Sequence, residues 1–459
     1  MTSLLANTTF LALLVAFAVV LVGWCAGWNS VATLRKLREV FTIWPVVVVL
    51  LLGGIFNSAF RIYVGSLNPG DFMADVVAAR QLLNHQFMYP PHIGFLIDKE
   101  MSDHPPIVEF RHAPKWMDMD ARTEHATIKM NAHPPFVGML VAVGLRFVTF
   151  RWVYLLLTLF TSAALVGMIL ICLRGLEIPF TRNDFLALTG LAFGWHPALS
   201  TLRAGQTSIL IAGGMTLGWF LLRKKRPVQE GVWVGLATAV KLYPGLLIVY
   251  FMLRSWRAFL SSVATLLGIQ LLTIAVCGAA NFRAFLYVVR FLSQPFYSRT
   301  NMSAVAFVSG FLKMPWITLL VVGSGIAVLA YWVSTRKKID RAENLDVEYS
   351  LCMVMQLLLT PIAWSHYLTV LILPLAVLGN YVFRSRPRWS AIAAYLGLAL
   401  CFSIPDTTVK YLQIVIQESA GYYMGWILTS IFTVCLVLLW AWLAMLSKKT
   451  ARQASVVSG

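Results

Sequence analysis

Residues 351–378 read LCMVMQLLLTPIAWSHYLTVLILPLAVL, two apolar arms separated by the polar and aromatic tetrapeptide at 364–367. Basic residues follow the second arm at 384–388. We interpret the stretch as a helical hairpin whose turn reaches the far side of a bilayer while the basic cluster stays on the near side. An unpaired polar group between apolar arms is costly, so this interruption marks a candidate site.

The same pattern occurs twice more. In LALTGLAFGWHPALSTLRAGQTSILIAGG (186–214) the interruption holds Arg203 and Gln206, and in GVWVGLATAVKLYPGLLIVYFML (231–253) it holds Lys241 and Tyr243. Basic residues follow each stretch downstream. We therefore expect the three interruptions to share one cavity on the non-cytoplasmic side.

Composition assigns the chain to the polytopic membrane proteins, because 59% of its residues are apolar and only 12% are charged. Backbone groups in lipid must be satisfied internally, and the period-two alternation of a membrane barrel is missing. The sequence therefore predicts an all-α fold of roughly eleven to thirteen transmembrane helices with a large first extracytoplasmic loop.

The net charge of +18 does not indicate nucleic acid, because the basic residues lie in short clusters between apolar runs. This distribution predicts a cytoplasmic C-terminus and an integral protein of the plasma (inner) membrane. The six cysteines have no paired spacing, and the histidines of the polar segment (His85, His92, His104, His112, His125 and His133) lack ligand-like spacing. We predict neither a metal site nor a cofactor.

We expect a single integral membrane domain over 1–459. Its parts are an extra N-terminal helix and cytoplasmic turn (1–41), an extracytoplasmic loop (61–133), a helical bundle (134–447) and a cytoplasmic tail (448–459). Within the loop, residues 71–87 have the spacing of an amphipathic helix lying on the membrane surface, whereas 98–129 shows no period and reads as a mobile insert. Membrane crossings counted from the N-terminus and from the C-terminus differ by one, and the difference arises between residues 134 and 206. One helical segment there is therefore expected to lie flat or to be re-entrant.

Asp71 directly precedes the amphipathic helix, about ten residues after a predicted span. A carboxylate there could accept the proton of an attacking hydroxyl, but Asp at a helix start is also a good N-cap, and the two roles can coexist. Asp75 lies one turn later on the same face and is the reserve candidate.

His366, between Trp364 and Tyr367, could donate to a phosphate or transfer a proton, or it could close the turn with a hydrogen bond. Lys241 favours an anionic partner such as a phosphate, against snorkelling to the interface. Arg203 could be a second cation or merely interfacial.

These motifs, taken in order, resemble those of the polyprenol-phosphate-dependent glycosyltransferases of the GT-C fold, specifically glycosyltransferase family 87, which includes phosphatidylinositol-mannoside mannosyltransferases. The resemblance covers residues 60–385. The matching positions are Gly70-Asp71, Tyr89, His133-Pro134-Pro135 where the family usually has Tyr-Pro-Pro, Gly205-Gln206, Lys241-Leu242-Tyr243-Pro244, Asn301 and Ser303, and Trp364-Ser365-His366-Tyr367.

The resemblance implies an inverting transfer of one sugar, with mannose favoured, from a polyprenyl-phosphate carrier to a lipid or glycan hydroxyl on the extracytoplasmic side. By carry-over Asp71 is the base, while His366 and Lys241 lie near the donor phosphate. The remaining matched positions that we expect to bind substrate are Gln206, Tyr243, Asn301, Ser303, Trp364 and Tyr367. The long insert before His133 and the extra helix before residue 42 depart from the family pattern.

A transporter or flippase of a lipid-linked substrate is the alternative. Its site would lie at the bilayer midplane between broken helices. No Asp or Glu lies deep within an apolar run, so an acidic coupling relay is missing. An enzyme needs Asp71, Lys241 and His366 to converge on one outward pocket, and this geometry separates the two alternatives.

Overall fold

The computed structural model describes residues 7–67, 70–89, 133–292, 301–312, 316–334, 342–384, 388–420, 427 and 430–457. Within these ranges every regular element is a helix, which confirms the all-α prediction for this part of the chain. The insert at 98–129, together with His92, His104, His112 and His125, lies outside the described residues.

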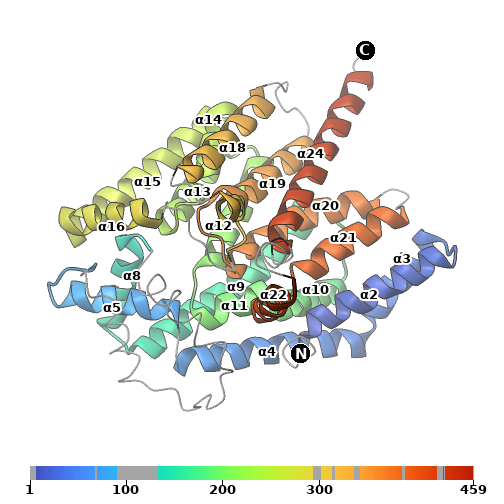
Figure 1. Ribbon diagram of the computed structural model, residues 1–459, viewed down its shortest axis with the longest axis horizontal. Coiled ribbons are helices and arrows are strands. Elements are labelled where there is room, and N and C mark those ends of the chain that lie inside the picture. Colours follow the sequence, from blue (N-terminus) through green and yellow to red (C-terminus); the bar gives the residue numbers. More distant parts are fainter. Residues whose placement is uncertain are drawn as a thin grey trace.

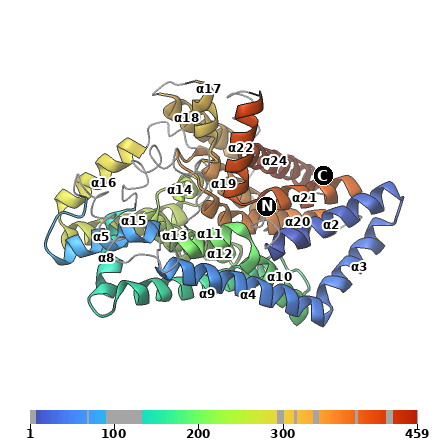
Figure 2. The same cartoon turned by 60° about the horizontal axis from the view of Figure 1, so that its bottom comes forward.

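The helices follow one another as α2 (Thr8–Cys25), α3 (Ser30–Thr42), α4 (Trp44–Leu67), α5 (Asp71–Leu83), α8 (Pro135–Leu145), α9 (Phe150–Gly175), α10 (Arg182–Gly194), α11 (His196–Ala204), α12 (Ser208–Arg223), α13 (Pro227–Val240), α14 (Gly245–Arg254), α15 (Trp256–Cys277), α16 (Ala279–Leu292), α17 (Ala304–Phe311), α18 (Ile317–Ser334), α19 (Ala342–Leu359), the 3₁₀ helix η1 (Ser365–Leu371), α20 (Ile372–Arg384), α21 (Trp389–Cys401), α22 (Asp406–Ala420) and α24 (Ile431–Val457). Helices α2 and α3 lie at one end of the molecule, and α5, α8 and α16 lie at the other (Figures 1 and 2).

Among the described residues, five segments are long and apolar enough to cross a membrane: α2, α4, α9, α15 and the continuous stretch from η1 through α20. Large apolar side chains on the outer faces of these segments are exposed. In α15, only 11% of the most apolar 18-residue stretch is buried inside the protein. Exposed apolar helix faces of this kind are stable against lipid rather than water. The chain is therefore an integral membrane protein.

Helices α10 and α11 both pack along α4. A Cβ added to Gly54 on α4 would lie 2.2 Å from the carbonyl oxygen of Gly190 on α10, so the two backbones touch and only glycine fits. The chain is extended at Trp195, and Pro197 follows in the first turn of α11, where its missing N–H has no helical partner to lose. The broken helix thereby ends at Gly205, beside the start of α5.

Helix α5 has the predicted start, but it is not a surface helix. Every residue from Phe72 to Ala79 is buried, because α8 packs against α5 and Tyr154 of α9 contacts Phe72. The prediction of an amphipathic helix with one exposed face is wrong, since periodicity identified the more apolar face but not the helices that cover the other one. Helix α8 has eleven residues and spans only about 16 Å.

Three acidic side chains are buried at the end of the bundle away from α5, in the first two turns of their helices. Asp346 is paired with Arg223, and Glu348 accepts two hydrogen bonds from Arg254 at 3.0 and 3.1 Å. Glu230, in the first turn of α13, is fully buried, and neither of its oxygens has a hydrogen-bond partner within the described ranges. None of these acids lies in the middle of a helix, in agreement with the sequence.

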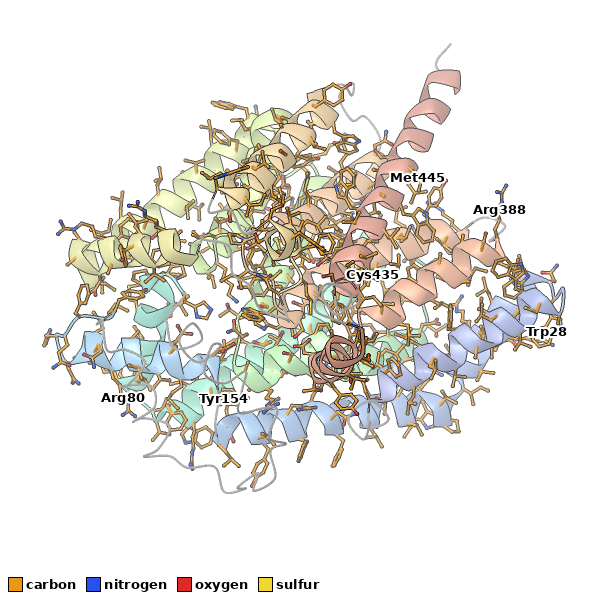
Figure 3. All side chains as sticks on the ribbon, in the orientation of Figure 1. Trp28, Arg80, Tyr154, Arg388, Cys435 and Met445 are labelled. Atoms are coloured by element: carbon orange, nitrogen blue, oxygen red, sulfur yellow. The ribbon has the colours of Figure 1, made fainter. Side chains whose placement is uncertain are left out.

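The N-terminal segment packs against α21. The indole nitrogen of Trp389 donates to the carbonyl oxygen of Trp28 at 2.9 Å, and Trp28 lies at the same end of the molecule as Arg388 (Figure 3). Helix α24 continues through the predicted tail to Val457. The extra helix is thus part of the bundle.

Candidate active site

Asp71 is the first residue of α5, and its carboxylate does not cap the helix. The N-cap is Gly70, whose φ of 49° lies in the left-handed region, and no side chain makes a capping hydrogen bond there. Instead, Oδ2 of Asp71 accepts a hydrogen bond of 2.8 Å from Nε2 of Gln206, 135 residues further along the chain. The capping alternative is therefore wrong. Asp71 is half-buried, so its carboxylate is not sealed off.

Gln206 reaches Asp71 because α11 ends in a tight left-handed turn. Gly205 has φ +64°, and a Cβ there would meet the Cβ of Phe72 at 2.7 Å, so glycine alone allows this approach. Gln206 also accepts a hydrogen bond of 2.7 Å at Oε1 from Nζ of Lys241. An ammonium can only donate, so Lys241 fixes the orientation of the amide and directs its Nε2–H at Asp71.

Lys241 lies at the extended break between α13 and α14 and is only 7% exposed. The snorkelling alternative is therefore wrong. Its ammonium lies 4.3 Å from the centre of the Tyr367 ring, and Tyr367 stacks on Tyr243 with ring centres 5.0 Å apart. A cation over an aromatic face is stabilised by the ring quadrupole. Two of the polar interruptions thus meet directly at Lys241 and Tyr367.

His366 is buried in the first turn of η1, with its ring edge-on to Tyr367 at 4.8 Å. Its Nε2 is buried and has no hydrogen-bond partner within the described part of the chain. The turn is closed instead by its backbone oxygen, which accepts from the hydroxyl of Thr369 at 2.9 Å. The turn-closing alternative for the imidazole is wrong, and the ring interacts electrostatically with Lys241 and His133.

Asn301 and Ser303 hold the segment that precedes η1. Asn301 donates to the carbonyl oxygen of Pro361 at 2.7 Å and accepts from the N–H of Ala363 at 2.9 Å. Ser303 caps α17 through the N–H of Ala306 at 3.0 Å. These hydrogen bonds are all made with backbone groups. Trp364 is half-buried beside them at the start of η1.

Arg203 is exposed in the last turn of α11 and interacts electrostatically with Arg61. No hydrogen bond or ion pair between described residues joins it to Asp71 or Lys241. It therefore lies beside the cluster, and its predicted role as a second cation stays a prediction.

Asp75 is 2% exposed and does not face open space as a reserve base would. Both its oxygens contact Nδ1 of His133, at 2.8 and 3.0 Å. Sequence reasoning recorded His133 only as part of a motif and missed this pair. The available signal was the histidine in place of the tyrosine that the resemblance leads one to expect. The described residues hold no group of three or more His, Cys, Asp or Glu side chains that could bind a metal.

A comparison with protein families now identifies the chain. The model of glycosyltransferase family 87 matches residues 131–361, which is half of the sequence. The chain belongs to glycosyltransferase family 87. The matched region contains Gln206, Lys241 and Asn301, whereas Asp71 and His366 lie outside it.

Curated relatives are about a quarter identical to this family 87 chain over the aligned residues. It is 25% identical over 263 residues to a polyprenol-phosphate-mannose-dependent α-(1-2)-phosphatidylinositol mannoside mannosyltransferase of Mycolicibacterium smegmatis. It is 26% identical over 308 residues to a polyprenol-phosphate-mannose-dependent α-(1-2)-phosphatidylinositol pentamannoside mannosyltransferase of the same organism, and 26% identical over 268 residues to one so named of Mycobacterium tuberculosis.

The three alignments cover 53, 64 and 56% of the family 87 chain and 58, 72 and 59% of the respective relatives. The chain thus matches little more than half the length of two of them. No solved structure matches the chain significantly.

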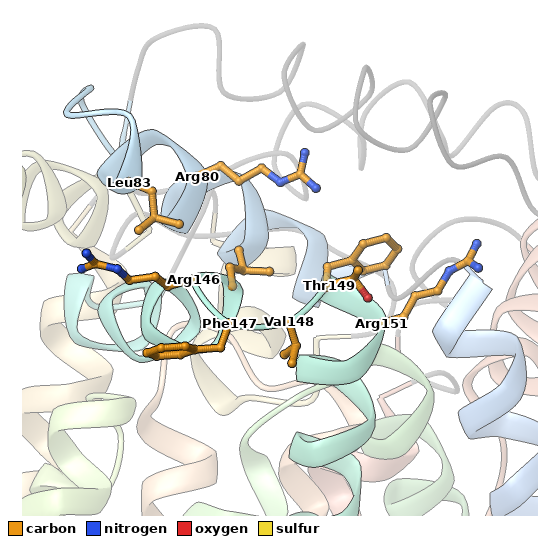
Figure 4. Close-up of a pocket in the computed structure, with 9 residues that line it drawn as sticks. Arg80, Leu83, Arg146, Phe147, Val148, Thr149 and Arg151 are labelled. Atoms are coloured by element: carbon orange, nitrogen blue, oxygen red, sulfur yellow. The ribbon is translucent and has the colours of Figure 1, made fainter.

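An open groove of about 720 Å³ lies at the far end of α5 from Asp71 (Figure 4). Arg80, Arg146 and Arg151 line it together with apolar side chains that include Phe147, which is 78% exposed. The groove is not lined by Asp71, Gln206, Lys241, His366 or Tyr367. It is a surface feature of the same helix and not the candidate active site.

Proposed function

We propose that this family 87 protein is a hexosyltransferase that moves one sugar, mannose in the first instance, from a polyprenyl-phosphate donor to a hydroxyl of a lipid or glycan. The observation that carries the proposal is the chain of hydrogen bonds from Asp71 through Gln206 to Lys241. It joins the carboxylate at the start of α5 to an ammonium through two of the breaks in apolar helices, at Gln206 and Lys241. The curated relatives, whose names give the same donor, support it.

Asp71 is the general base of the proposed reaction. The amide of Gln206 donates to Oδ2 of Asp71 and fixes the orientation of the carboxylate. Oδ1 accepts the proton of the acceptor hydroxyl as the acceptor oxygen attacks C1 of the sugar. Attack on the face opposite the phosphate inverts the configuration at C1.

Lys241 and His366 serve the leaving group. The bond between C1 and the phosphate oxygen breaks with both electrons going to oxygen, and polyprenyl phosphate departs with an added negative charge. A cation and a hydrogen-bond donor fixed beside that oxygen stabilise the developing charge most when water is excluded. The burial of Lys241 and the unpartnered Nε2 of His366 support these roles.

The orientation follows from the helices that leave the site. Helix α12 begins two residues after Gln206 and ends at Arg223, and α14 begins four residues after Lys241 and ends at Arg254. Basic residues favour the cytoplasmic side, so we place the site on the extracytoplasmic face of the plasma membrane and the C-terminus in the cytoplasm. We retain eleven to thirteen crossings, with α10 and α11 forming one broken crossing and α8 lying flat, because α8 is too short for a bilayer core of about 30 Å.

The test is transfer from a panel of radiolabelled polyprenyl-phosphate sugars into membrane lipids, in proteoliposomes that contain wild type, Asp71→Asn or the matched control Asp184→Asn. Asp184 lies in the first turn of α10, away from the site. We expect label to reach a new lipid with the wild type and the control and not with Asp71→Asn. A fully active Asp71→Asn protein would refute the base assignment. Label that only changes leaflet, equally in all three, would indicate a flippase.

A further inference from the structure

Cys401 and Cys435 bring two thiols together between α21 and α24. Cys401 is the last residue of α21 and is half-buried, whereas Cys435 lies in the second turn of α24 and is 5% exposed. The two helices pack against each other, both cysteines belong to the main apolar core, and their thiols are hydrogen-bond partners. Figure 3 labels Cys435 at the end of α24 away from Met445.

The other four cysteines have no such neighbour. Among the described residues, no second thiol pairs with Cys25, Cys172, Cys277 or Cys352. The spacing of the cysteines along the sequence gave no indication of a pair, because the two thiols come from separate helices. Proximity of two thiols is the geometric requirement for a disulfide bond, and Cys401 and Cys435 are the one described pair that meets it.

Hydrogen bonds anchor the backbone close to each thiol. Two residues after Cys401, the hydroxyl of the fully buried Ser403 donates to the carbonyl oxygen of Ala399 at 2.8 Å. Two residues before Cys435, the hydroxyl of Thr433 donates to the carbonyl oxygen of Met302 at 2.9 Å. These bonds keep the end of α21 and the start of α24 in place, so the two thiols stay beside each other.

The pair lies at the end of the bundle that holds the candidate active site. Five residues after Cys401, the carboxylate of Asp406 accepts a hydrogen bond from the hydroxyl of Ser365 in η1. The opposite ends of the two helices carry basic residues, with Arg388 before α21 and the cluster at 448–452 in the last turns of α24. In the orientation proposed above, the thiols therefore face the extracytoplasmic side, where disulfides form and persist.

We propose that Cys401 and Cys435 form a disulfide that joins α21 to α24 on the extracytoplasmic side. The oxidant is the disulfide of an extracytoplasmic thiol–disulfide oxidoreductase. The thiolate of the more exposed Cys401 attacks that disulfide, which forms a mixed disulfide and releases one thiolate of the oxidoreductase. The thiolate of Cys435 then attacks Sγ of Cys401 and releases the second one. Two electrons pass to the oxidoreductase, and its two thiolates take up the two protons that the cysteines lose.

The test reads the redox state of each cysteine in the full-length protein. Cells that express it are lysed in denaturant with N-ethylmaleimide, which caps free thiols, and the remaining disulfides are then reduced and capped with iodoacetamide. Mass spectrometry assigns the two caps. For the wild type we expect maleimide on four of the six cysteines and iodoacetamide on Cys401 and Cys435. Cys401→Ser should carry five maleimides and no second cap.

The matched control is Cys172→Ser, because Cys172 is buried on α9 and has no thiol partner in the described chain. It should carry three maleimides and keep both iodoacetamide caps. A reductant should lower the unfolding temperature of the wild type and of the control and leave that of Cys401→Ser unchanged, because a disulfide stabilises by restricting the unfolded chain.

Six maleimides on the wild type would overturn the proposal, as would an iodoacetamide cap on any cysteine other than Cys401 and Cys435. Two iodoacetamide caps on Cys401→Ser, or an equal effect of reductant on all three proteins, would do the same. The inference uses the proposed orientation but not the transfer chemistry. Because no readout depends on sugar transfer, the disulfide and the assignment of Asp71 as the base stand or fall separately.

Discussion

Replacing Gln206 with leucine tests the link between the base and the cation. Gln206 is 5% exposed and makes two hydrogen bonds to charged groups, 2.8 Å to Asp71 and 2.7 Å to Lys241. Each bond of this kind contributes about 1.5–3 kcal/mol. Loss of the bond to Asp71 should lower kcat by about 10- to 150-fold if it acts in the transition state. Loss of the acceptor for a buried ammonium should also destabilise the fold by about 3 kcal/mol.

The assay is single-turnover transfer of labelled sugar with saturating donor, together with thermal unfolding of the purified protein in detergent. The matched control is Gln356→Leu, because Gln356 is also buried, at 2% exposure, and its one hydrogen bond to another described residue runs from Nε2 to the sulfur of Met215 at 3.3 Å. We expect the control to keep wild-type activity and stability. A Gln206→Leu protein within twofold of wild-type kcat would refute the proposed importance of the hydrogen bond from Gln206 to Asp71.

Further substitutions test the opposite end of the bundle. Arg254→Met removes both hydrogen bonds of the charged partner of the buried Glu348, which keeps the hydroxyl of Tyr250 at 3.4 Å. It should cost about 3–5 kcal/mol of unfolding free energy, so a loss under about 1 kcal/mol by denaturant titration would contradict the buried pair. Glu230→Gln should leave stability and transfer unchanged, because neither carboxylate oxygen has a partner in the described chain; loss of activity with an intact fold would assign Glu230 a role. Arg38 holds the pKa of Asp184 at about 2, below the ordinary 3.8, so their bridge stabilises the fold above about pH 4 and the effect is lost as the pH falls towards 2. Arg38→Gln should therefore lower the free energy of unfolding by less than about 1 kcal/mol at pH 7 and leave it unchanged at pH 2; an equal difference at both would contradict the bridge.

The position of the candidate site could be predicted from the sequence, because the proposed sugar transfer needs polar residues and these interrupt otherwise apolar helices. The interruptions at Gln206, Lys241 and Tyr367 were expected to meet, and hydrogen bonding and cation–aromatic contact join them. The bonding order was not predictable, because nothing in the pattern indicates that Gln206 lies between Asp71 and Lys241. That order depends on the left-handed turn at Gly205.

Other parts of the arrangement depend on contacts that no local pattern encodes. The pairing of Asp75 with His133 joins positions 58 residues apart. The segment between them has no hydrophobic periodicity from which the pairing could be predicted. The burial of α5 on all sides depends on α8, and the roles of Asn301 and Ser303 in holding residues 361–363 depend on a packing partner 60 residues away. Periodicity gives the faces of a helix, and only the tertiary fold assigns them neighbours.

The hold of Asn301 on the segment before η1 has a consequence for how this chain can vary in length. The backbone is fixed at Pro361 and Ala363, and His366 follows in a helix with three residues per turn. One residue inserted between Ala363 and His366 would rotate the imidazole by about 120° around the helix axis, out of line with Lys241, although every side chain of the motif would still be present. Spacing from Ala363 to His366 is therefore as much a part of the site as the residues themselves.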